Sequence, residues 1–107
     1  MTSQDQLAAI EALLQARKGA DPQSSYVAGL YAKGVDAIAK KVGEEAAETI
    51  IAAKNPDDAA LIYEVADLWF HTLVLLSHRG LASAEVLKEL ERRMGTSGLT
   101  EKAARVK

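Results

Sequence analysis

The chain has 107 residues, of which 49% are hydrophobic, and it carries 13 basic and 15 acidic side chains. This length predicts one domain, residues 1–107, and the near-neutral charge argues against general nucleic-acid binding. The absence of cysteine excludes disulfides and thiolate metal sites and is typical of a reducing compartment. We find no signal peptide and no apolar run approaching membrane-spanning length, so we expect a cytoplasmic protein without membrane partners.

The first two helices are predicted from apolar spacing and from their end signals. One spans Thr2–Lys18 and ends at Gly19. The second is short, is capped by Ser24 or Ser25, and continues to Lys33. The apolar residues with helical spacing in the first helix are Leu7, Ile10, Leu13 and Leu14.

Two long helices follow, separated by a turn. The third helix is expected from Val35 to Lys54, with its carboxylates on sides other than its apolar face. Asn55 as cap and Pro56 as first residue predict a fourth helix that runs to Arg79 and stops at Gly80. The apolar face of the third helix comprises Val35, Ile38, Val42, Ala46, Thr49 and Ala53.

The fourth helix is apolar around most of its circumference. A helix with this pattern is expected to be buried, so its polar stripe should lie inside a groove. The apolar positions are Leu61, Ile62, Val65, Leu68, Trp69, Leu73 and Leu76. The polar stripe consists of Glu64, Asp67, His71 and His78, shared only with Val74.

A last helix is expected from a cap at Ser83 to a stop at Gly95, with Val86, Leu87, Leu90 and Met94 spaced for packing. No segment alternates like a strand, so the fold class is all-α, a bundle of four to five helices. Ile50 and Ile51 point to different sides of the third helix. We therefore expect a homodimer, or a larger homo-oligomer, whose helix pairs complete a four-helix core.

Two acidic pairs flank the turn at residues 55–58. Glu45 and Glu48 precede it, and Glu64 and Asp67 follow it at matching distances, so an antiparallel helix pair brings all four carboxylates to one level. Their mutual repulsion favours a bound cation, and oxygen ligands suit Mg²⁺, or alternatively Mn²⁺. A single acidic pair on a helix is usually a solvated face, but two pairs brought level by a turn are harder to explain that way.

Basic residues near these carboxylates favour phosphate chemistry. A lysine near phosphates neutralises the charge that develops as a phosphoanhydride bond breaks. The flanking lysines are Lys33, Lys40, Lys41 and Lys54. The tail offers the loop Gly95–Gly98 together with Lys102 and Arg105, which suits a polyanionic substrate. His71 is interpreted as a supporting or structural residue.

The segments Glu44-Glu45-x-x-Glu48 and Glu64-x-x-Asp67 resemble the paired motif of the all-α nucleoside triphosphate pyrophosphohydrolases, the superfamily of MazG-type enzymes and dimeric dUTPases. The closer resemblance is to the phosphoribosyl-ATP pyrophosphatase family of histidine biosynthesis. It is carried by Asp21-Pro22-x-Ser24-Ser25-Tyr26, Lys41-Val42-Gly43-Glu44-Glu45-Ala46, Ala66-Asp67-Leu68 and the tail Ser97-Gly98-x-x-Glu101-Lys102-Ala103.

The resemblance implies an enzyme that hydrolyses phosphoribosyl-ATP to phosphoribosyl-AMP and pyrophosphate. It implies that Glu45, Glu48, Glu64 and Asp67 are both catalytic residues and Mg²⁺ ligands, with Glu44 orienting or deprotonating the attacking water. It also implies that Lys41 and Lys54 face substrate phosphates. Two alternatives stay open: a house-cleaning pyrophosphohydrolase of the same superfamily, and a non-catalytic helical dimerisation module with the acidic stripe as a docking surface.

Overall fold

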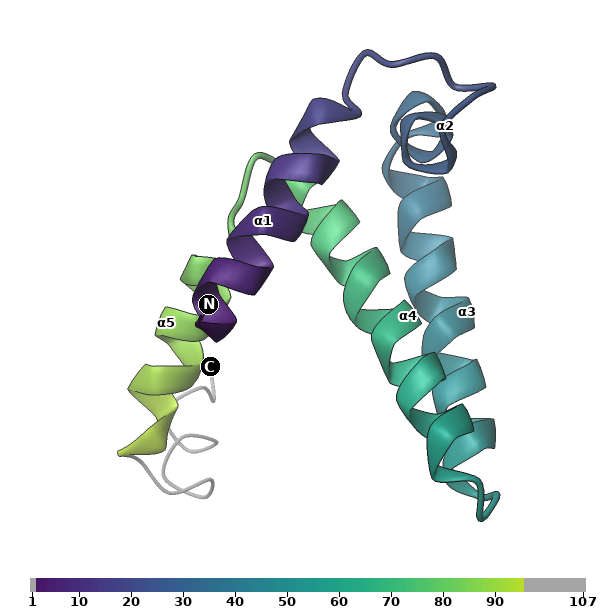
Figure 1. Ribbon diagram of the computed structural model, residues 1–107, viewed down its shortest axis with the longest axis vertical. Coiled ribbons are helices and arrows are strands. Elements are labelled where there is room, and N and C mark those ends of the chain that lie inside the picture. The colour runs from purple at the N-terminus through teal and green to yellow at the C-terminus, as the bar shows by residue number, and fades with distance from the viewer. Residues whose placement is uncertain (1, 96–107) are drawn as a thin grey trace, which may run out of the picture.

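The computed structural model describes residues 2–95 and shows five α-helices in that range, with no strand among these residues (Figure 1). The helices are α1 (Ser3–Ala16), α2 (Tyr26–Lys33), α3 (Val35–Ala53), α4 (Asp58–His78) and α5 (Ser83–Met94). The all-α class expected from the sequence is confirmed. The predicted tail elements Lys102 and Arg105, and most of the Gly95–Gly98 loop, lie outside the described residues.

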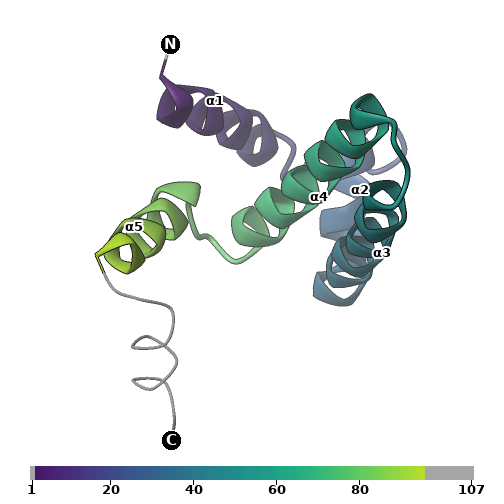
Figure 2. The same cartoon turned by 90° about the horizontal axis from the view of Figure 1, so that it is seen from below.

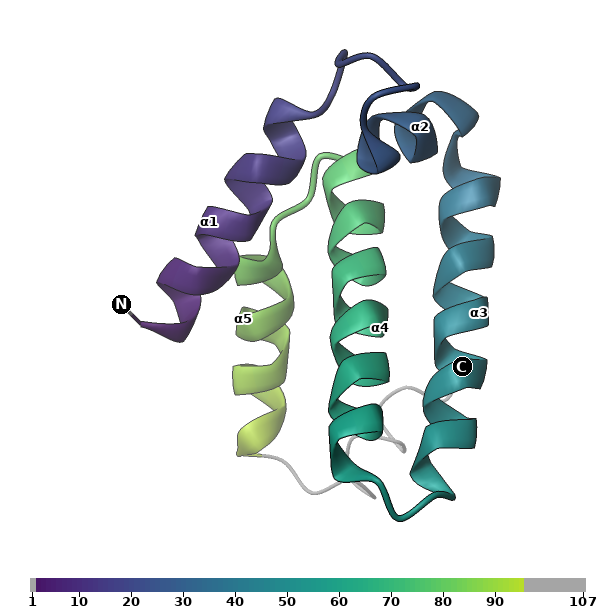
Figure 3. The same cartoon turned by 45° about the vertical axis from the view of Figure 1, so that its right-hand side comes forward.

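Helices α3 and α4 form an antiparallel pair, the most extensive helix contact in the described chain (Figure 3). Short helix α2 continues into α3 through Gly34, whose φ of 94° is a conformation that favours glycine. Helix α1 packs against the C-terminal part of α4, and α5 lies beside α1 (Figure 1). The α3–α4 pair is therefore the frame that brings the two acidic segments together.

The helix starts differ in detail from the predicted caps. Asp57, not Asn55, caps α4, because its carboxylate accepts hydrogen bonds from the N–H groups of Ala59 at 3.0 Å and Ala60 at 3.3 Å. Asn55 instead donates from its side chain to the Ile51 carbonyl at the end of α3. A second correction of this kind concerns the last helix.

Ser83 is the first residue of α5 and not its cap, which is Ala82. Its backbone N–H donates to a Glu11 carboxylate oxygen at 3.0 Å, and its hydroxyl donates to the other oxygen. Glu11 of α1 thus satisfies an N–H group at the start of α5 from across the fold. Of the two serines proposed for α2, Ser25 is the cap, and it accepts from the Ala28 N–H.

The hydrophobic core is small and lies where α1, α2, α3 and α4 meet. Ile38 of α3 and Val74 of α4 are completely buried. The other buried members of this cluster are Leu14, Val27, Leu30 and Leu73. The radius of gyration is 16.1 Å, whereas a compact domain of this length has about 13 Å, so a single chain is less compact than a typical domain.

Much of the apolar surface predicted to be buried is exposed on a single chain. On α4, Ile62 and Tyr63 are each 69% exposed and Trp69 is 62% exposed. Ile50 and Ile51 of α3 are also exposed. A single chain therefore does not bury α4 all round, because its other helices leave the side that carries Ile62, Tyr63 and Trp69 uncovered.

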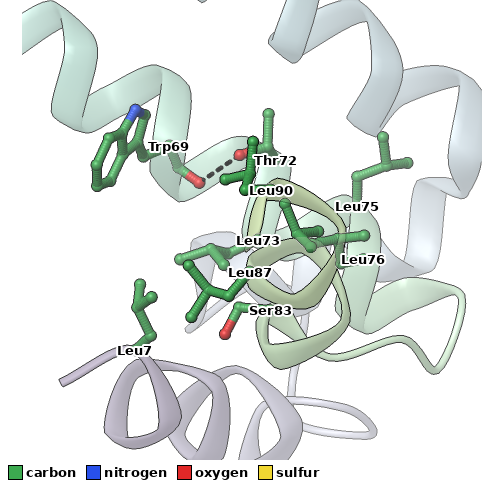
Figure 4. A pocket seen from close by; sticks show the side chains of 10 residues that line it. Leu7, Trp69, Thr72, Leu73, Leu75, Leu76, Ser83, Leu87 and Leu90 are labelled. Carbon is green, nitrogen blue, oxygen red and sulfur yellow. Dashed lines mark hydrogen bonds between the residues drawn. The ribbon is translucent and has the colours of Figure 1, made fainter. Parts of the chain in front are cut away.

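An open apolar groove of about 480 Å³ runs between α1, α4 and α5 (Figure 4). Leu87 and Leu90 of α5 face Leu73 and Leu76 of α4 across it, and Leu7 of α1 closes one end. Seen from below, α1 and α5 diverge from the α3–α4 pair (Figure 2). The apolar residues of α5 therefore line a groove, and Met94 at the end of that helix is 85% exposed.

Helix α4 is long and apolar enough to span a membrane by length and composition. The expectation that no apolar run approaches that length is therefore wrong. One such helix is weak support for a membrane span. Of its polar residues, His71 is buried and Asp67 is partly buried against the rest of the fold.

Candidate metal centre

Three carboxylates converge between α3 and α4. Glu45 comes from α3, and Glu64 and Asp67 come from successive turns of α4. One oxygen from each of the three carboxylates lies within 4.8 Å of the others. The juxtaposition expected from the spacing around the turn is thus present for three of the four acidic residues.

Glu45 is 8% exposed, the only buried carboxylate among the described residues. The predicted facing of α3 is wrong here, because the carboxylates were expected away from its packed side. Val35 is 46% exposed and Ala53 is exposed, whereas Ile38, Glu45 and Ala52 are buried. The buried face of α3 is therefore rotated toward Glu45, which places a charged group at the helix contact.

Glu48 lies nearer the turn than the group of three. Together with Glu64 it lines an open pocket of about 370 Å³ at the turn end of the helix pair. Glu48 is close enough to Glu64 to raise its pKa. Glu48, the fourth predicted carboxylate, therefore lies beside the group of three, on the side nearer the turn between α3 and α4.

The electrostatics of the site show crowding of negative charge. Partial burial raises the pKa of Glu64, and the charges of Glu48, Glu45 and Asp67 raise it further. Lys41 offsets part of this charge, since its Nζ lies 3.7 Å from a Glu45 oxygen and 3.4 Å from a Glu44 oxygen. One lysine charge thus faces several carboxylate charges, so the group keeps a net negative charge that a further cation would balance.

The remaining predicted site residues separate into two places. Lys41 and Glu44 form an ion pair at the edge of the carboxylate group, and the Glu44 side chain is 48% exposed. Lys54 is the C-terminal cap of α3, exposed at the turn end of the helix pair. Lys102 and Arg105 lie outside the described residues.

Tyr26 is a site neighbour that the sequence analysis named only in the motif Asp21-Pro22-x-Ser24-Ser25-Tyr26, without assigning it to the site. Its hydroxyl lies 2.7 Å from Nε2 of His71, and Nδ1 of His71 lies 2.8 Å from the Asp67 carbonyl oxygen. His71 is 4% exposed. The sequence signal that could have pointed to Tyr26 was its position. It directly follows Ser25, the cap of α2, and α2 leads into α3.

The donor set fits a hard divalent cation. Three carboxylates with an oxygen each within 4.8 Å of the others offer only oxygen ligands, which Mg²⁺ and Mn²⁺ accept. Burial raises the pKa of Glu64 and the neighbouring carboxylate charges raise it further, which is the repulsion that a bound cation would relieve. An antiparallel pair of helices with a carboxylate group and a lysine between them defines an all-α protein with a candidate divalent-cation site.

Comparison with known proteins identifies the family. A family model described as phosphoribosyl-ATP pyrophosphohydrolase matches residues 7–94. The chain is 60% identical to the phosphoribosyl-ATP pyrophosphatase of Azoarcus sp. strain BH72, over 90% of each chain. It is 55% identical to that of Hydrogenovibrio crunogenus, over 98% of this chain and 96% of the relative, and 58% identical to that of Neisseria gonorrhoeae, over 92% of each. The chain belongs to the phosphoribosyl-ATP pyrophosphohydrolase family, and the resemblance inferred from its motifs is confirmed.

The raised pKa of Glu64 predicts how stability without metal depends on pH. A carboxyl group whose pKa is higher in the folded than in the unfolded state stabilises the fold only while protonated. That contribution is complete below the ordinary value of 4.5 and is lost as the pH rises through the raised folded-state pKa. In EDTA, Glu64→Gln should therefore be more stable than the parent at pH 7, and the difference should vanish towards pH 4.5. Urea denaturation of both proteins across this pH range measures the difference in their free energies of unfolding. A difference that does not change with pH would contradict the charge crowding.

Proposed function

We propose that the protein hydrolyses phosphoribosyl-ATP to phosphoribosyl-AMP and pyrophosphate, the second step of histidine biosynthesis, in the cytoplasm. The observation that carries this proposal is the group formed by Glu45, Glu64 and Asp67 in a chain of this family. The curated relatives carry the name phosphoribosyl-ATP pyrophosphatase and match over nearly the whole chain.

The proposed cation is Mg²⁺, with Mn²⁺ as a substitute, and its proposed ligands are Glu45, Glu48, Glu64 and Asp67. When bound, such a cation polarises phosphate oxygens and neutralises their charge. Support comes from the oxygen donor set and from the raised pKa of Glu64. Glu48 would join the ligands by turning its side chain away from the pocket at the turn.

The chain's own residues supply the remaining functions in this proposal. Lys41 stands beside the carboxylates and contacts the phosphates, where its positive charge stabilises the charge that develops on the leaving group. Lys54 contacts a more distant phosphate from the turn end of the site. Glu44, which is half exposed at the edge of the group, orients or deprotonates the attacking water.

We further infer that two copies of the chain associate into a homodimer, or a larger homo-oligomer, with a shared four-helix core. The exposed apolar side chains of α3 and α4 and the large radius of gyration support this arrangement. A second copy would cover surface that a single chain leaves in contact with water.

Turnover of a substrate panel tests the activity. The purified protein, with Mg²⁺, is assayed for pyrophosphate release from phosphoribosyl-ATP, ATP, dUTP and modified nucleoside triphosphates, with EDTA as the control. We expect phosphoribosyl-ATP to have the highest kcat/KM. A preference for a modified nucleotide would indicate a house-cleaning enzyme of the same superfamily, and no Mg²⁺-dependent turnover would indicate a non-catalytic helical module.

The basic tail is predicted to contact the anionic substrate through Lys102 and Arg105. Truncation after Met94 should then raise the KM for phosphoribosyl-ATP, while helix content by circular dichroism stays largely intact because α1–α5 all end by that residue. The double variant Lys102→Gln/Arg105→Gln keeps the tail length and separates charge from length. Unchanged kinetics in the truncated protein would reduce the tail to a linker.

A further inference from the structure

A hydrogen-bonded pair links α2 to α4 beside the carboxylate group. The Tyr26 hydroxyl lies 2.7 Å from Nε2 of His71, and Nδ1 of the same ring lies 2.8 Å from the Asp67 carbonyl oxygen. Because a carbonyl oxygen can only accept, Nδ1 carries the proton and donates, and in the neutral ring Nε2 accepts. The Tyr26 hydroxyl is therefore the donor to His71.

The geometry of the two rings is fixed on several sides. The Tyr26 ring meets the His71 ring edge to face, with centroids 5.8 Å apart, and Phe70 meets His71 in the same way at 5.3 Å. His71 is 4% exposed, whereas Tyr26 is 55% exposed. The hydroxyl is thus held against a buried partner while the rest of the tyrosine lies at the surface of the site.

The Tyr26 hydroxyl belongs to the same electrostatic environment as the carboxylates. Burial raises the pKa of Tyr26, the Lys41 charge lowers it, and the charges of Glu45, Asp67 and Glu44 raise it. The chain continues from α2 through Gly34 directly into α3, which carries Lys41 and Glu45. The anchoring of Tyr26 on α4 therefore affects the position of the start of α3 relative to Asp67.

We propose that Tyr26 and His71 are positioning residues for the carboxylate group. Their hydrogen bond anchors the start of α2 to the turn of α4 that carries Asp67, and so sets the separation of the Glu45 and Asp67 carboxylates across the two helices. This inference rests on the proposed cation site. Partners that orient the ligands of a metal typically change its affinity by about 10–100-fold when removed.

Helix α2 offers a matched control for this proposal. The Tyr31 hydroxyl donates to the Leu14 carbonyl at 3.1 Å and accepts from the Ser77 hydroxyl of α4 at 3.0 Å. Tyr26→Phe and Tyr31→Phe therefore remove the same atom from the same helix, and each breaks a hydrogen bond to α4. Ser77 lies about three helical turns beyond Asp67, so only the first substitution touches the carboxylate group.

The test measures the dissociation constant for Mn²⁺ by isothermal titration on EDTA-stripped protein, alongside the melting temperature and kcat/KM. We expect both phenylalanine variants to melt below the parent. Only Tyr26→Phe should weaken Mn²⁺ binding, by about tenfold, with kcat/KM reduced at subsaturating metal and recovered in part by excess Mg²⁺. A second variant, His71→Leu, should weaken binding at least as much, and Tyr26→Phe should add little to it because both changes remove the Tyr26–His71 hydrogen bond.

The outcomes separate this inference from the proposed function. If the parent binds Mn²⁺ and turns over substrate while Tyr26→Phe matches Tyr31→Phe in metal affinity, the pair is structural only and the inference is overturned, whereas the proposed function stands. If the parent binds no Mn²⁺, the proposed cation site fails and the inference fails with it. Because Tyr26→Phe keeps the ring and its packing, the test does not depend on His71→Leu folding.

Discussion

Replacing Glu45, Glu64 or Asp67 by the corresponding amide should lower kcat/KM by about 100-fold or more while leaving the protein at least as stable without metal. The amide keeps the shape of the side chain and removes one of the charges whose repulsion raises the pKa of Glu64. Losses of this size accompany removal of single preorganised charge-stabilising groups in other enzymes. Glu48→Gln should also lower kcat/KM without lowering the stability of the metal-free protein, because Glu48 contributes to the same repulsion.

The response to Mg²⁺ gives a second measure of the same variants. A ligand at 100 times its dissociation constant stabilises the folded state by about 2.7 kcal/mol, and one at its dissociation constant by about 0.4 kcal/mol. An amide variant that binds Mg²⁺ 100-fold more weakly should therefore lose most of the rise in melting temperature seen for the parent. Calorimetry with and without Mg²⁺ checks this.

Glu91→Gln is the control for these variants, because Glu91 is an exposed residue of α5, away from α3 and α4. It should leave turnover and the Mg²⁺ response unchanged, since exposed charges interact weakly. Amide variants of the carboxylate group that behave like Glu91→Gln would identify a solvated acidic face. The metal site, and the enzymatic function built on it, would then have to be abandoned.

Ile62→Glu should convert the proposed dimer to a monomer and lower the melting temperature of the protein. Ile62 is 69% exposed on a single chain, so the substitution leaves the chain's own core intact and affects only a surface that a second copy would cover. Burying a charge there without a partner costs far more than the isoleucine contributes. Leu73→Asp is less informative, because Leu73 is 8% exposed and belongs to the chain's own core.

Sedimentation at micromolar concentration measures the association, and circular dichroism reports whether the helices persist. Ala59→Glu introduces the same charge at an exposed position near the start of the same helix and should stay dimeric. The melting temperature of the parent should also rise with protein concentration. A parent that sediments as a folded monomer, or an Ile62→Glu variant that remains dimeric, contradicts the proposed association.

Local sequence signals were sufficient for the helices and for the approximate level of the acidic pairs. Helical spacing and glycine stops are short-range properties of the chain, so α1–α5 appear within a few residues of their predicted bounds. The turn between α3 and α4 then fixes which residues of the two helices lie opposite each other. Two caps were misplaced. At Asn55 the nearby Asp57 caps α4 instead, and at Ser83 the N–H group is bound by Glu11 of α1, a contact between distant segments.

The rotation of each helix was decided by tertiary packing. The apolar positions on α3 left its facing ambiguous, and packing against α4 selected the face that buries Glu45. Similarly, α4 is apolar on more sides than one chain can cover, and only the packing of the other helices decided that Trp69 and Ile62 are among the side chains left exposed on a single chain.

The sequence by itself determined the helical class, the family and the approximate level at which the acidic pairs of the two long helices lie, because periodicity and motif spacing are properties of the chain alone. Only the tertiary structure showed that Glu45, Glu64 and Asp67 form the tight group with Glu48 beside it, and that Tyr26 reaches His71. These contacts join side chains from different helices. Their distances depend on helix rotation and separation, which are set by packing across the whole fold and not by any one segment.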